Sequence, residues 1–328
     1  MQKKSLIPFK IETLDPLGQG VSKIADQITF IAKTLPGEEG EADLVRKRKQ
    51  VGFANLIKVT KPSQIREKSA CPHFWQCSGC HYLHTSYENE IHFKKETIQK
   101  IFREWPGFPV EIHPAPRRFD YRNRVQLHYD LKSGKLGFHR SQSSQVIEVP
   151  SCLLPLGAIK EAIKSLYENQ SWMKTARRFK EPQGHVELYL KGSEVIQSWN
   201  KSYADGGFTQ VFSEMNDELK KWISKQLSNQ EFKILDLFGG NGNISANLTF
   251  QERLVVDYYS DPPSEGFVSQ DLFDAKAVFN IQEKINFEPN LLIFDPPRSG
   301  VKNLEEWTQA FPAQTILYVS CDPHTLAR

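Results

Sequence analysis

The sequence lacks long hydrophobic runs, internal repeats and low-complexity segments. No apolar run approaches the roughly 20 residues of a membrane-spanning helix, and the opening MQKKSLIPFK has no signal-peptide core. With 39% hydrophobic and 25% charged residues, the composition is that of an ordinary globular protein. We therefore expect a cytoplasmic, monomeric protein of two or three domains that does not bind a membrane.

Cysteine is scarce, and five residues of this kind exclude a regular disulfide framework. Three thiols lie in CPHFWQCSGC at 71–80, and thiolates this close need a metal to neutralise their charge. Cys152, further along the chain, completes a set of four that suits a [4Fe-4S] cluster or a structural zinc site. Zinc sites favour paired C-x2-C knuckles, so the spacing favours the cluster, with zinc as the alternative.

The sequence also lacks a large excess of charge of either sign, because its 42 basic and 39 acidic residues give a net charge of 42 − 39 = +3. The basic residues are nevertheless clustered, with RKRK at 46–49 and four arginines within 117–124. Such clusters suit a polyanion, although a basic run is often only a solvated surface.

Residues 1–60 consist of short alternating apolar and polar runs separated by glycine turns such as Gly18-Gln19-Gly20. This spacing predicts a small β-barrel of the oligonucleotide-binding type. The basic run at 46–49 would then follow a phosphate backbone. A barrel that only packs against its neighbours is the alternative.

The middle of the chain is helical at 87–103 and 155–169 and strand-like between 117 and 149 and near 185–199. Arginines alternate there with aromatic side chains, which predicts RNA binding, with phosphates on guanidinium groups and bases on rings. Arginine–carboxylate pairs across a sheet are the alternative. The rings concerned are those of Phe119, Tyr121, Tyr129, Phe138 and His139.

The stretch KILDLFGGNGNISANL at 233–248 predicts a strand, a glycine loop and a helix. Gly240 and Gly242 would let a ligand approach the backbone at the start of that helix. Neither G-x-G-x-x-G nor the Lys-Ser/Thr of a phosphate-binding loop is present, which disfavours a nucleoside triphosphate. The next strand, LVVD, ends in Asp257, whose carboxylate suits the ribose of an adenosine-containing cofactor.

Two later strands also end in reactive side chains. NLLIFDPPRSG at 290–300 predicts a strand that ends at Asp295, where two prolines fix the following loop. The run at 316–319 predicts a buried strand that delivers Cys321 into a turn. Because ligands gather at the carboxyl ends of strands in α/β sheets, we expect both groups beside the cofactor pocket. A buried, inert cysteine is the alternative.

Taken in order, these motifs resemble those of the RNA 5-methyluridine methyltransferases, in particular the iron–sulfur branch that modifies 23S ribosomal RNA. The resemblance covers nearly the whole chain and includes CPHFWQCSGC, FTQVF, DLFGGNGN, DPPRSG and YVSCDPHTLAR. It implies an α/β fold with a Rossmann-like S-adenosylmethionine-dependent methyltransferase domain at 206–328. A TRAM-like RNA-binding barrel at 1–62 and a central α+β iron–sulfur and RNA-binding domain at 63–205 would precede it.

The resemblance also implies residue roles. Cys321 would be the nucleophile that adds to carbon 6 of a flipped-out uracil, so that carbon 5 can take a methyl group. Asp295 would bond to the uracil ring or help to place the cofactor. The implied cofactors are S-adenosylmethionine and a [4Fe-4S] cluster, and the implied partner is RNA. The residues implied around the cofactor and uracil are Gln210, Phe238, Asn243, Asp257, Asp271 and Asp295, and the implied cluster ligands are Cys71, Cys77, Cys80 and Cys152.

The chain departs from the family pattern at four places. Gly239 stands where the family usually has cysteine, and Asp322 where it usually has asparagine. Only thirteen residues, 258–270, separate Asp257 from Asp271, whereas the family has a full helix that walls the adenine pocket. The family's general-base glutamate and last strands would lie beyond Arg328, so we expect a truncated sequence without that base.

Three alternative functions remain. A catalytically impaired paralogue would bind RNA without methyl transfer. A zinc-stabilised nucleic-acid-binding protein would leave DLFGGNGN, DPPR and SCDP unexplained. A transfer RNA uridine is also a possible target, but bacterial transfer RNA enzymes of this family typically lack the barrel and the cluster, which favours ribosomal RNA.

Overall fold

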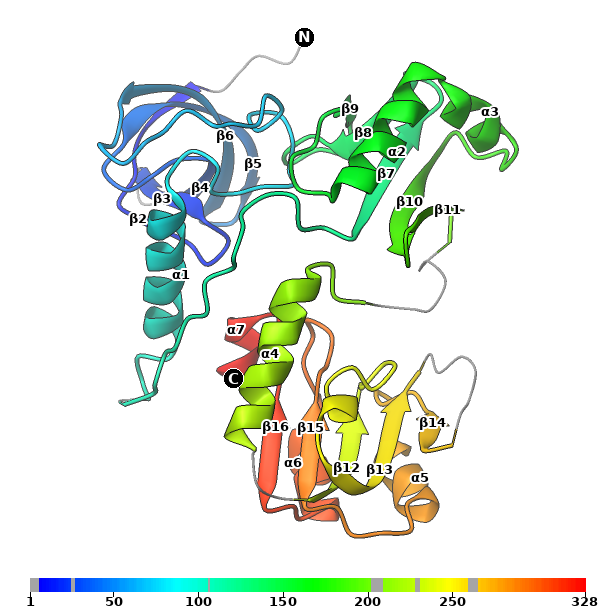
Figure 1. Cartoon of the computed structure of the whole chain (residues 1–328). Helices are drawn as coiled ribbons and strands as arrows, with labels where there is room; N and C mark the ends of the chain where they lie inside the picture. The colour runs from blue at the N-terminus through cyan, green and yellow to red at the C-terminus, as the bar shows by residue number, and fades with distance from the viewer. Residues whose placement is uncertain (1–5, 25–26, 106, 202–208, 228–230, 259–264) are drawn as a thin grey trace. The chain divides into compact units, whose positions relative to one another are not determined.

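The computed structural model describes residues 6–24, 27–105, 107–201, 209–227, 231–258 and 265–328. The chain divides into two compact units, Met1–Asn200 and Lys201–Arg328. Two sheets belong to the first unit and one to the second (Figure 1). In the described part of the chain, no helix has the length and apolar character needed to cross a membrane.

A curved six-stranded sheet forms the beginning of the first unit. Its strands follow the order β1-β5-β6-β4-β3-β2, and β1 also lies against β3, so the sheet curls back on itself. The expected alternation buries Phe9, Ile11, Ile31, Ala42 and Ala54 in one core. The strands are β1 (Leu6–Lys10), β2 (Thr13–Leu14), β3 (Gln19–Ile24), β4 (Gln27–Ala32), β5 (Glu39–Arg48) and β6 (Val51–Lys61). The basic run at 46–49 lies exposed at the β5–β6 hairpin.

Helix α1 (Tyr87–Ile101) follows, and it confirms the helical prediction for this stretch. Ser86 caps its start, because the hydroxyl accepts a hydrogen bond from the Asn89 amide at 3.2 Å. Acidic side chains in the first turn and Lys100 in the last suit the helix dipole.

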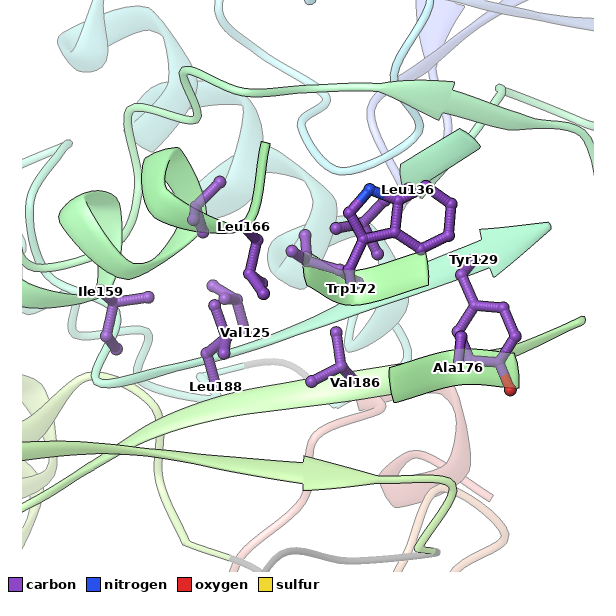
Figure 2. Packing of buried hydrophobic residues seen from close by; sticks show 11 residues of the cluster. Val125, Tyr129, Leu136, Ile159, Leu166, Trp172, Ala176, Val186 and Leu188 are labelled. Atoms are coloured by element: carbon purple, nitrogen blue, oxygen red, sulfur yellow. The ribbon is translucent and has the colours of Figure 1, made fainter. Parts of the chain in front are cut away.

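The second sheet has the order β11-β10-β7-β8-β9, and helices α2 and α3 cover one face of it. Figure 2 shows the core between them, where Trp172 of α3 lies among residues of α2, β7 and β10 such as Leu166, Val125 and Val186. The elements are β7 (Arg124–Asp130), β8 (Lys135–His139), β9 (Val146–Glu148), α2 (Gly157–Glu168), α3 (Ser171–Arg177), β10 (Gln183–Lys191) and β11 (Glu194–Trp199).

This core corrects part of the RNA-binding prediction for the middle of the chain. Tyr129 is only 1% exposed, so its ring is not available to a base, and the half-buried Phe138 packs against the same core. The alternation of β7 turns Tyr129 inward together with Leu127. Arg124 pairs with Glu187 of the neighbouring strand at 3.3 Å, as the alternative interpretation expected.

The second unit is a parallel sheet with the order β14-β13-β12-β15-β16, the 3-2-1-4-5 arrangement of doubly wound folds. Helix α4 packs on one face through Ile223, and α5 and α6 pack on the other through Ile281 and Trp307. The elements are α4 (Ser213–Gln226), β12 (Phe232–Leu237), β13 (Phe250–Asp257), β14 (Phe267–Ser269), α5 (Ala277–Lys284), β15 (Leu291–Phe294), α6 (Leu304–Ala310), β16 (Thr315–Tyr318) and α7 (Pro323–Leu326).

Two expectations for this unit are wrong. The glycine loop leads into a single 3-10 turn, Ser245–Asn247, because only twelve residues, 238–249, join β12 to β13 and the glycines among them disfavour a helix. Strand β16 is not buried: it lies at the sheet edge, and Ile316 is 49% exposed. The start of the FTQVF motif, residue 208, lies outside the described residues.

Candidate active site at the carboxyl edge of the parallel sheet

Three neighbouring strands end at the same level of the sheet. Leu237 of β12 pairs with Val256 of β13 on one side and with Phe294 of β15 on the other. The backbone amide of Asp295 donates to the Leu237 carbonyl at 3.1 Å, which extends the ladder to that residue. The chain order reverses between β12 and β15, and doubly wound folds bind ligands at such a reversal.

The glycine loop turns sharply above this edge and is fastened to β13. Phe238 and Gly240 both have positive φ, at 60° and 54°. The amide of Gly239 donates to the Val256 carbonyl at 3.3 Å, and the amide of Gly240 donates to Oδ2 of Asp257 at 2.9 Å. Asp257 therefore holds the loop backbone at the end of its own strand.

Asp236 lies buried directly beneath this loop. Its side chain is 1% exposed, and neither carboxylate oxygen has a hydrogen-bond partner in the described part of the chain. A Cβ atom on Gly239 would lie 2.6 Å from Cγ of Asp236 and 2.7 Å from Cγ1 of Val255. A residue with a side chain at position 239 would therefore need Asp236 to move, which explains the glycine there.

Burial controls the ionisation of the carboxylates at this edge. Burial raises the pKa of Asp236 to about 7, and the neighbouring charge of Asp295 adds to this effect. Burial also raises the pKa of Asp295 to about 6, and the neighbouring charge of Asp257 adds to this effect. A carboxylate edge of this kind favours a ligand with positive charge or hydroxyl donors.

The loop after β15 and the loop after β16 are fastened to each other. Thr325 Oγ1 donates to the Arg298 carbonyl at 3.0 Å, and the Val301 amide donates to the Tyr318 hydroxyl at 3.3 Å. The carboxylate of Asp322 caps α7 by accepting from the His324 amide at 3.0 Å. These contacts place the loops that carry Asp295 and Cys321 side by side.

Cys321 is exposed, so the alternative of a buried, inert cysteine is wrong. It lies two residues beyond Val319, whose amide donates to the Phe294 carbonyl at 2.7 Å, and Asp295 follows Phe294 directly. The structure thus brings the predicted thiol and carboxylate to one edge of one sheet.

The other predicted cofactor residues lie around the glycine loop or on segments next to it. The Phe238 ring packs against that of Phe273, with centroids 5.4 Å apart. The Asn243 amide exchanges two 2.9 Å hydrogen bonds with Asn216 of α4. Asp271 is exposed and accepts from the Phe273 amide at 2.9 Å, while Gln210 is half-buried just before α4.

Nine residues, 258–266, connect β13 to β14. The expected loss of one wall of the adenine pocket concerns this connection, and its residues 259–264, which include Asp261-Pro262-Pro263, lie outside the described residues.

A second candidate site lies in the first unit, where the four predicted metal ligands line one cavity of about 260 Å³. All four thiols are free of disulfides. Burial, together with the neighbouring Cys152, Cys77 and Cys71, raises the pKa of Cys80 to about 12. These thiols would thus ionise only against a strongly positive group.

The donor set can be compared with two kinds of metal centre. Among the described residues, no group of three or more His, Cys, Asp or Glu side chains is arranged to hold a metal ion. Four free thiols that line one cavity are a donor set that either a [4Fe-4S] cluster or a zinc ion could use.

Lys33 is a residue of this site that the sequence did not reveal. Its buried ammonium donates to the carbonyls of Phe74 and, at 2.9 Å, of Cys77. Burial lowers the pKa of Lys33 to about 8, although the nearby thiols of Cys77, Cys80 and Cys71 oppose this change. No sequence signal connects Lys33 to cysteines that begin 38 positions further along the chain.

Among known proteins, no family model matches the chain, but individual relatives do. The 23S rRNA (uracil(1939)-C(5))-methyltransferase RlmD of Vibrio parahaemolyticus is 26% identical over 390 aligned positions, covering 97% of this chain and 87% of that protein. An uncharacterized RNA methyltransferase of Bdellovibrio bacteriovorus is 26% identical, covering 99% and 85%. The alignment with the Vibrio protein spans 390 positions, whereas this chain has 328 residues. That relative therefore has additional residues, at least 390 − 328 = 62, within the matched span.

Among solved structures, the chain resembles the tRNA (uracil-54, C5)-methyltransferase of Pyrococcus abyssi in complex with S-adenosyl-L-homocysteine. The TM-score is 0.71 at 19% identity, with 98% of this chain and 91% of that chain covered. This likeness confirms the α/β methyltransferase fold preceded by an N-terminal sheet.

Proposed function

Because the chain belongs to the RNA 5-methyluridine methyltransferase family, we propose that it methylates carbon 5 of a uridine in RNA. The relatives confirm the resemblance that the sequence motifs indicated. The observation that carries the proposal is the edge of the parallel sheet, where Asp295 and the exposed Cys321 end adjacent strands beside the glycine loop.

Cys321 is assigned the role of nucleophile because carbon 5 of uracil is too weak a nucleophile to take a methyl group unaided. The thiolate of Cys321 adds to carbon 6, and the electron pair of the broken carbon 5–carbon 6 double bond makes carbon 5 nucleophilic. Bound S-adenosylmethionine supplies the electrophilic methyl group. A base then takes the carbon 5 proton, and the electron pair of that bond re-forms the carbon 5–carbon 6 double bond as the bond from carbon 6 to Cys321 breaks and releases the thiolate.

The remaining residues at the edge bind and orient. The backbone of the glycine loop, held by Asp257, would receive the cofactor, and the carboxylates of Asp257 and Asp271 would accept hydrogen bonds from it. Gln210, Phe238 and Asn243 would complete the binding surface. Asp295 would bond to the uracil ring or to the cofactor, since it ends the strand that lies between the glycine-loop strand and the strand that leads to Cys321.

We propose further that Cys71, Cys77, Cys80 and Cys152 hold one [4Fe-4S] cluster with a structural role. The cavity that these four thiols share supports the assignment. Such a cluster would tie the loop at 71–80 to the segment after β9, which lies more than seventy residues further along the chain.

Ribosomal RNA is the target that we favour over transfer RNA. The Vibrio relative is named for 23S ribosomal RNA, and the cysteine quartet belongs to the iron–sulfur branch of the resemblance. We assign residues 1–62 to an RNA-binding barrel, 63–205 to the central iron–sulfur domain and 206–328 to methyl transfer. A monomer in the reducing cytoplasm suits five free thiols.

The test uses RNA in which 5-fluorouridine replaces uridine. Fluorine at carbon 5 cannot leave as a proton, so the protein–RNA adduct should persist once the methyl group has been transferred. We expect a denaturation-resistant complex on gels that requires S-adenosylmethionine, and no complex with Cys321→Ser, whose hydroxyl is far less ionised.

Two outcomes would contradict the proposal. An adduct that persists in Cys321→Ser would place the nucleophile elsewhere. RNA binding without any adduct, and without methyl transfer to ordinary RNA, would favour the impaired paralogue.

A further inference from the structure

A cleft of about 650 Å³ lies in the first unit, between the six-stranded sheet and the loop that carries the cysteines. Its volume lies within the roughly 300–1,000 Å³ of ligand-binding clefts. Residues 55–59 of β6 form one wall, and Arg66, Trp75 and Gln76 form another. Arg140 and Ser141, just after β8, also line this cleft, which we call the Trp75 cleft.

The charges around the Trp75 cleft favour an anion. Four basic side chains line it, and Asp43 is the one carboxylate among its lining residues. Lys58 and Arg140 are exposed, so their charges are accessible to a ligand. A phosphodiester backbone complements this arrangement.

Trp75 offers an aromatic surface inside this basic cleft. The ring is 50% exposed although the neighbouring Phe74 is buried, and the two rings meet edge to face with centroids 5.1 Å apart. The Arg66 guanidinium lies 5.7 Å from the Trp75 ring centre. Arg66 is itself fixed, because it bonds to the buried carboxylate of Glu38 at 2.6 Å and to the Lys33 carbonyl at 2.9 Å.

We propose that the Trp75 cleft binds a nucleotide of the RNA substrate, with the base stacked on Trp75 and the backbone phosphates on Lys58 and Arg140. This inference rests on the proposed function, which supplies RNA as the ligand. A preorganised ring and flanking cations are the combination by which proteins hold single-stranded nucleic acid without reading its sequence.

The loop at 71–80, which carries Trp75, borders both the Trp75 cleft and the cysteine cavity. Phe74 and Cys77, on either side of Trp75-Gln76, line the cysteine cavity, and both carbonyls accept hydrogen bonds from Lys33. A group bound to the four thiols would therefore hold Trp75 in place. A cluster at this position would thus support RNA binding by fixing Trp75, a role that is separate from methyl transfer.

The first experiment measures the affinity of the full-length protein, with its metal content intact, for a fluorescently labelled single-stranded RNA by anisotropy. Trp75→Leu keeps an apolar side chain but removes the ring, and should weaken binding by about five- to 150-fold, the range for one stacked base. Trp75→Phe should retain most of the affinity. Trp105→Leu is the matched control, since Trp105 is 55% exposed but lies outside the cleft.

The second experiment separates base stacking from phosphate binding. An RNA with abasic sites should bind equally to the wild type and to Trp75→Leu, because it has no base to stack. Lys58→Gln should instead reduce the slope of log affinity against log salt by about 0.7 for each phosphate of a single strand that the protein no longer neutralises.

The outcomes distinguish this inference from the proposed function. If Trp75→Leu has wild-type iron content, melting temperature and RNA affinity, the cleft is not a base-binding site, although adduct formation with 5-fluorouridine can still succeed. If Trp75→Leu loses iron or unfolds, the wild type itself decides, because the inference requires it to bind abasic RNA more weakly than ordinary RNA, and equal affinity for the two would overturn it. A wild-type protein that binds no RNA would overturn both proposals.

Discussion

Replacing Asp236 with asparagine should stabilise the ligand-free protein increasingly as the pH rises from 3.8 to about 7. Asp236 sits inside β12 with 1% of its surface exposed, and within the described residues its carboxylate oxygens have no hydrogen-bond partner. Burial raises its pKa from the ordinary value of 3.8 to about 7. The folded protein must therefore carry an unfavourable buried charge at alkaline pH.

The size of the effect follows from the interval between the two pKa values. Between pH 3.8 and about 7 the folded state keeps the proton that the unfolded state has lost, so stability falls as pH rises through this window. The interval of 7 − 3.8 = 3.2 pH units corresponds to about 4 kcal/mol at about 1.4 kcal/mol per unit. Asparagine has nearly the same shape and cannot ionise, so Asp236→Asn should avoid this loss.

The assay is differential scanning calorimetry of the full chain without cofactor. The advantage of Asp236→Asn should grow from pH 5 to pH 8, where it should reach about 4 kcal/mol and raise the melting temperature of the second unit by about 10 °C. Hydrogen exchange of the β12 amides would locate the change. Asp274→Asn, at an exposed carboxylate, is the control. Equal pH dependence in wild type and Asp236→Asn would mean that Asp236 is paired in solution, and the reasoning would fail.

Three further predictions concern the cysteines, the cofactor and the glycine loop. Cys152→Ser should lose the iron and sulfide that we expect in anaerobically purified protein. It should also unfold at a lower temperature, because one bond between distant segments is gone. Zinc as the only metal in the wild type would refute the cluster. Asp257→Ala should weaken S-adenosylmethionine binding by about 1.5–3 kcal/mol in calorimetry, since Asp257 also holds the Gly240 amide; unchanged affinity would remove Asp257 from the site. Gly239→Ala should destabilise the protein by about 1–3 kcal/mol in urea titrations, because its Cβ would lie 2.6 Å from Asp236 Cγ. Gly157→Ala, with no atom within 4 Å of the new Cβ, should be close to neutral.

The sequence predicted the strands of the parallel sheet well. Buried parallel strands read as continuous apolar runs, and the runs that end at Asp257 and Asp295 are of this kind. The polar residue after each run marks the edge where the site lies. The strand before Cys321 was located correctly, but its burial was not, since an edge strand and a central strand share the same pattern.

Other features could not be predicted because they depend on contacts between distant segments. Tyr129 was expected to meet RNA bases, but α3 packs Trp172 over the same face and buries it (Figure 2). The helix expected after the glycine loop is absent because the next strand begins within twelve residues. Trp75 and Lys58 belong to one cleft only because the cysteine loop lies beside β6.

By itself, the sequence determined the order of the motifs, the chemistry of each reactive side chain and the strand ends on which they lie. Apolar runs and glycine turns are local signals, so these features need no knowledge of distant residues. The tertiary structure alone decided which side chains are buried away from solvent. It buried Asp236 without a partner and enclosed Lys33 beside the thiols, while it left Cys321 and Trp75 exposed. Burial changes the free energy of a charged or aromatic group by several kcal/mol, and it depends on packing between segments far apart in the chain.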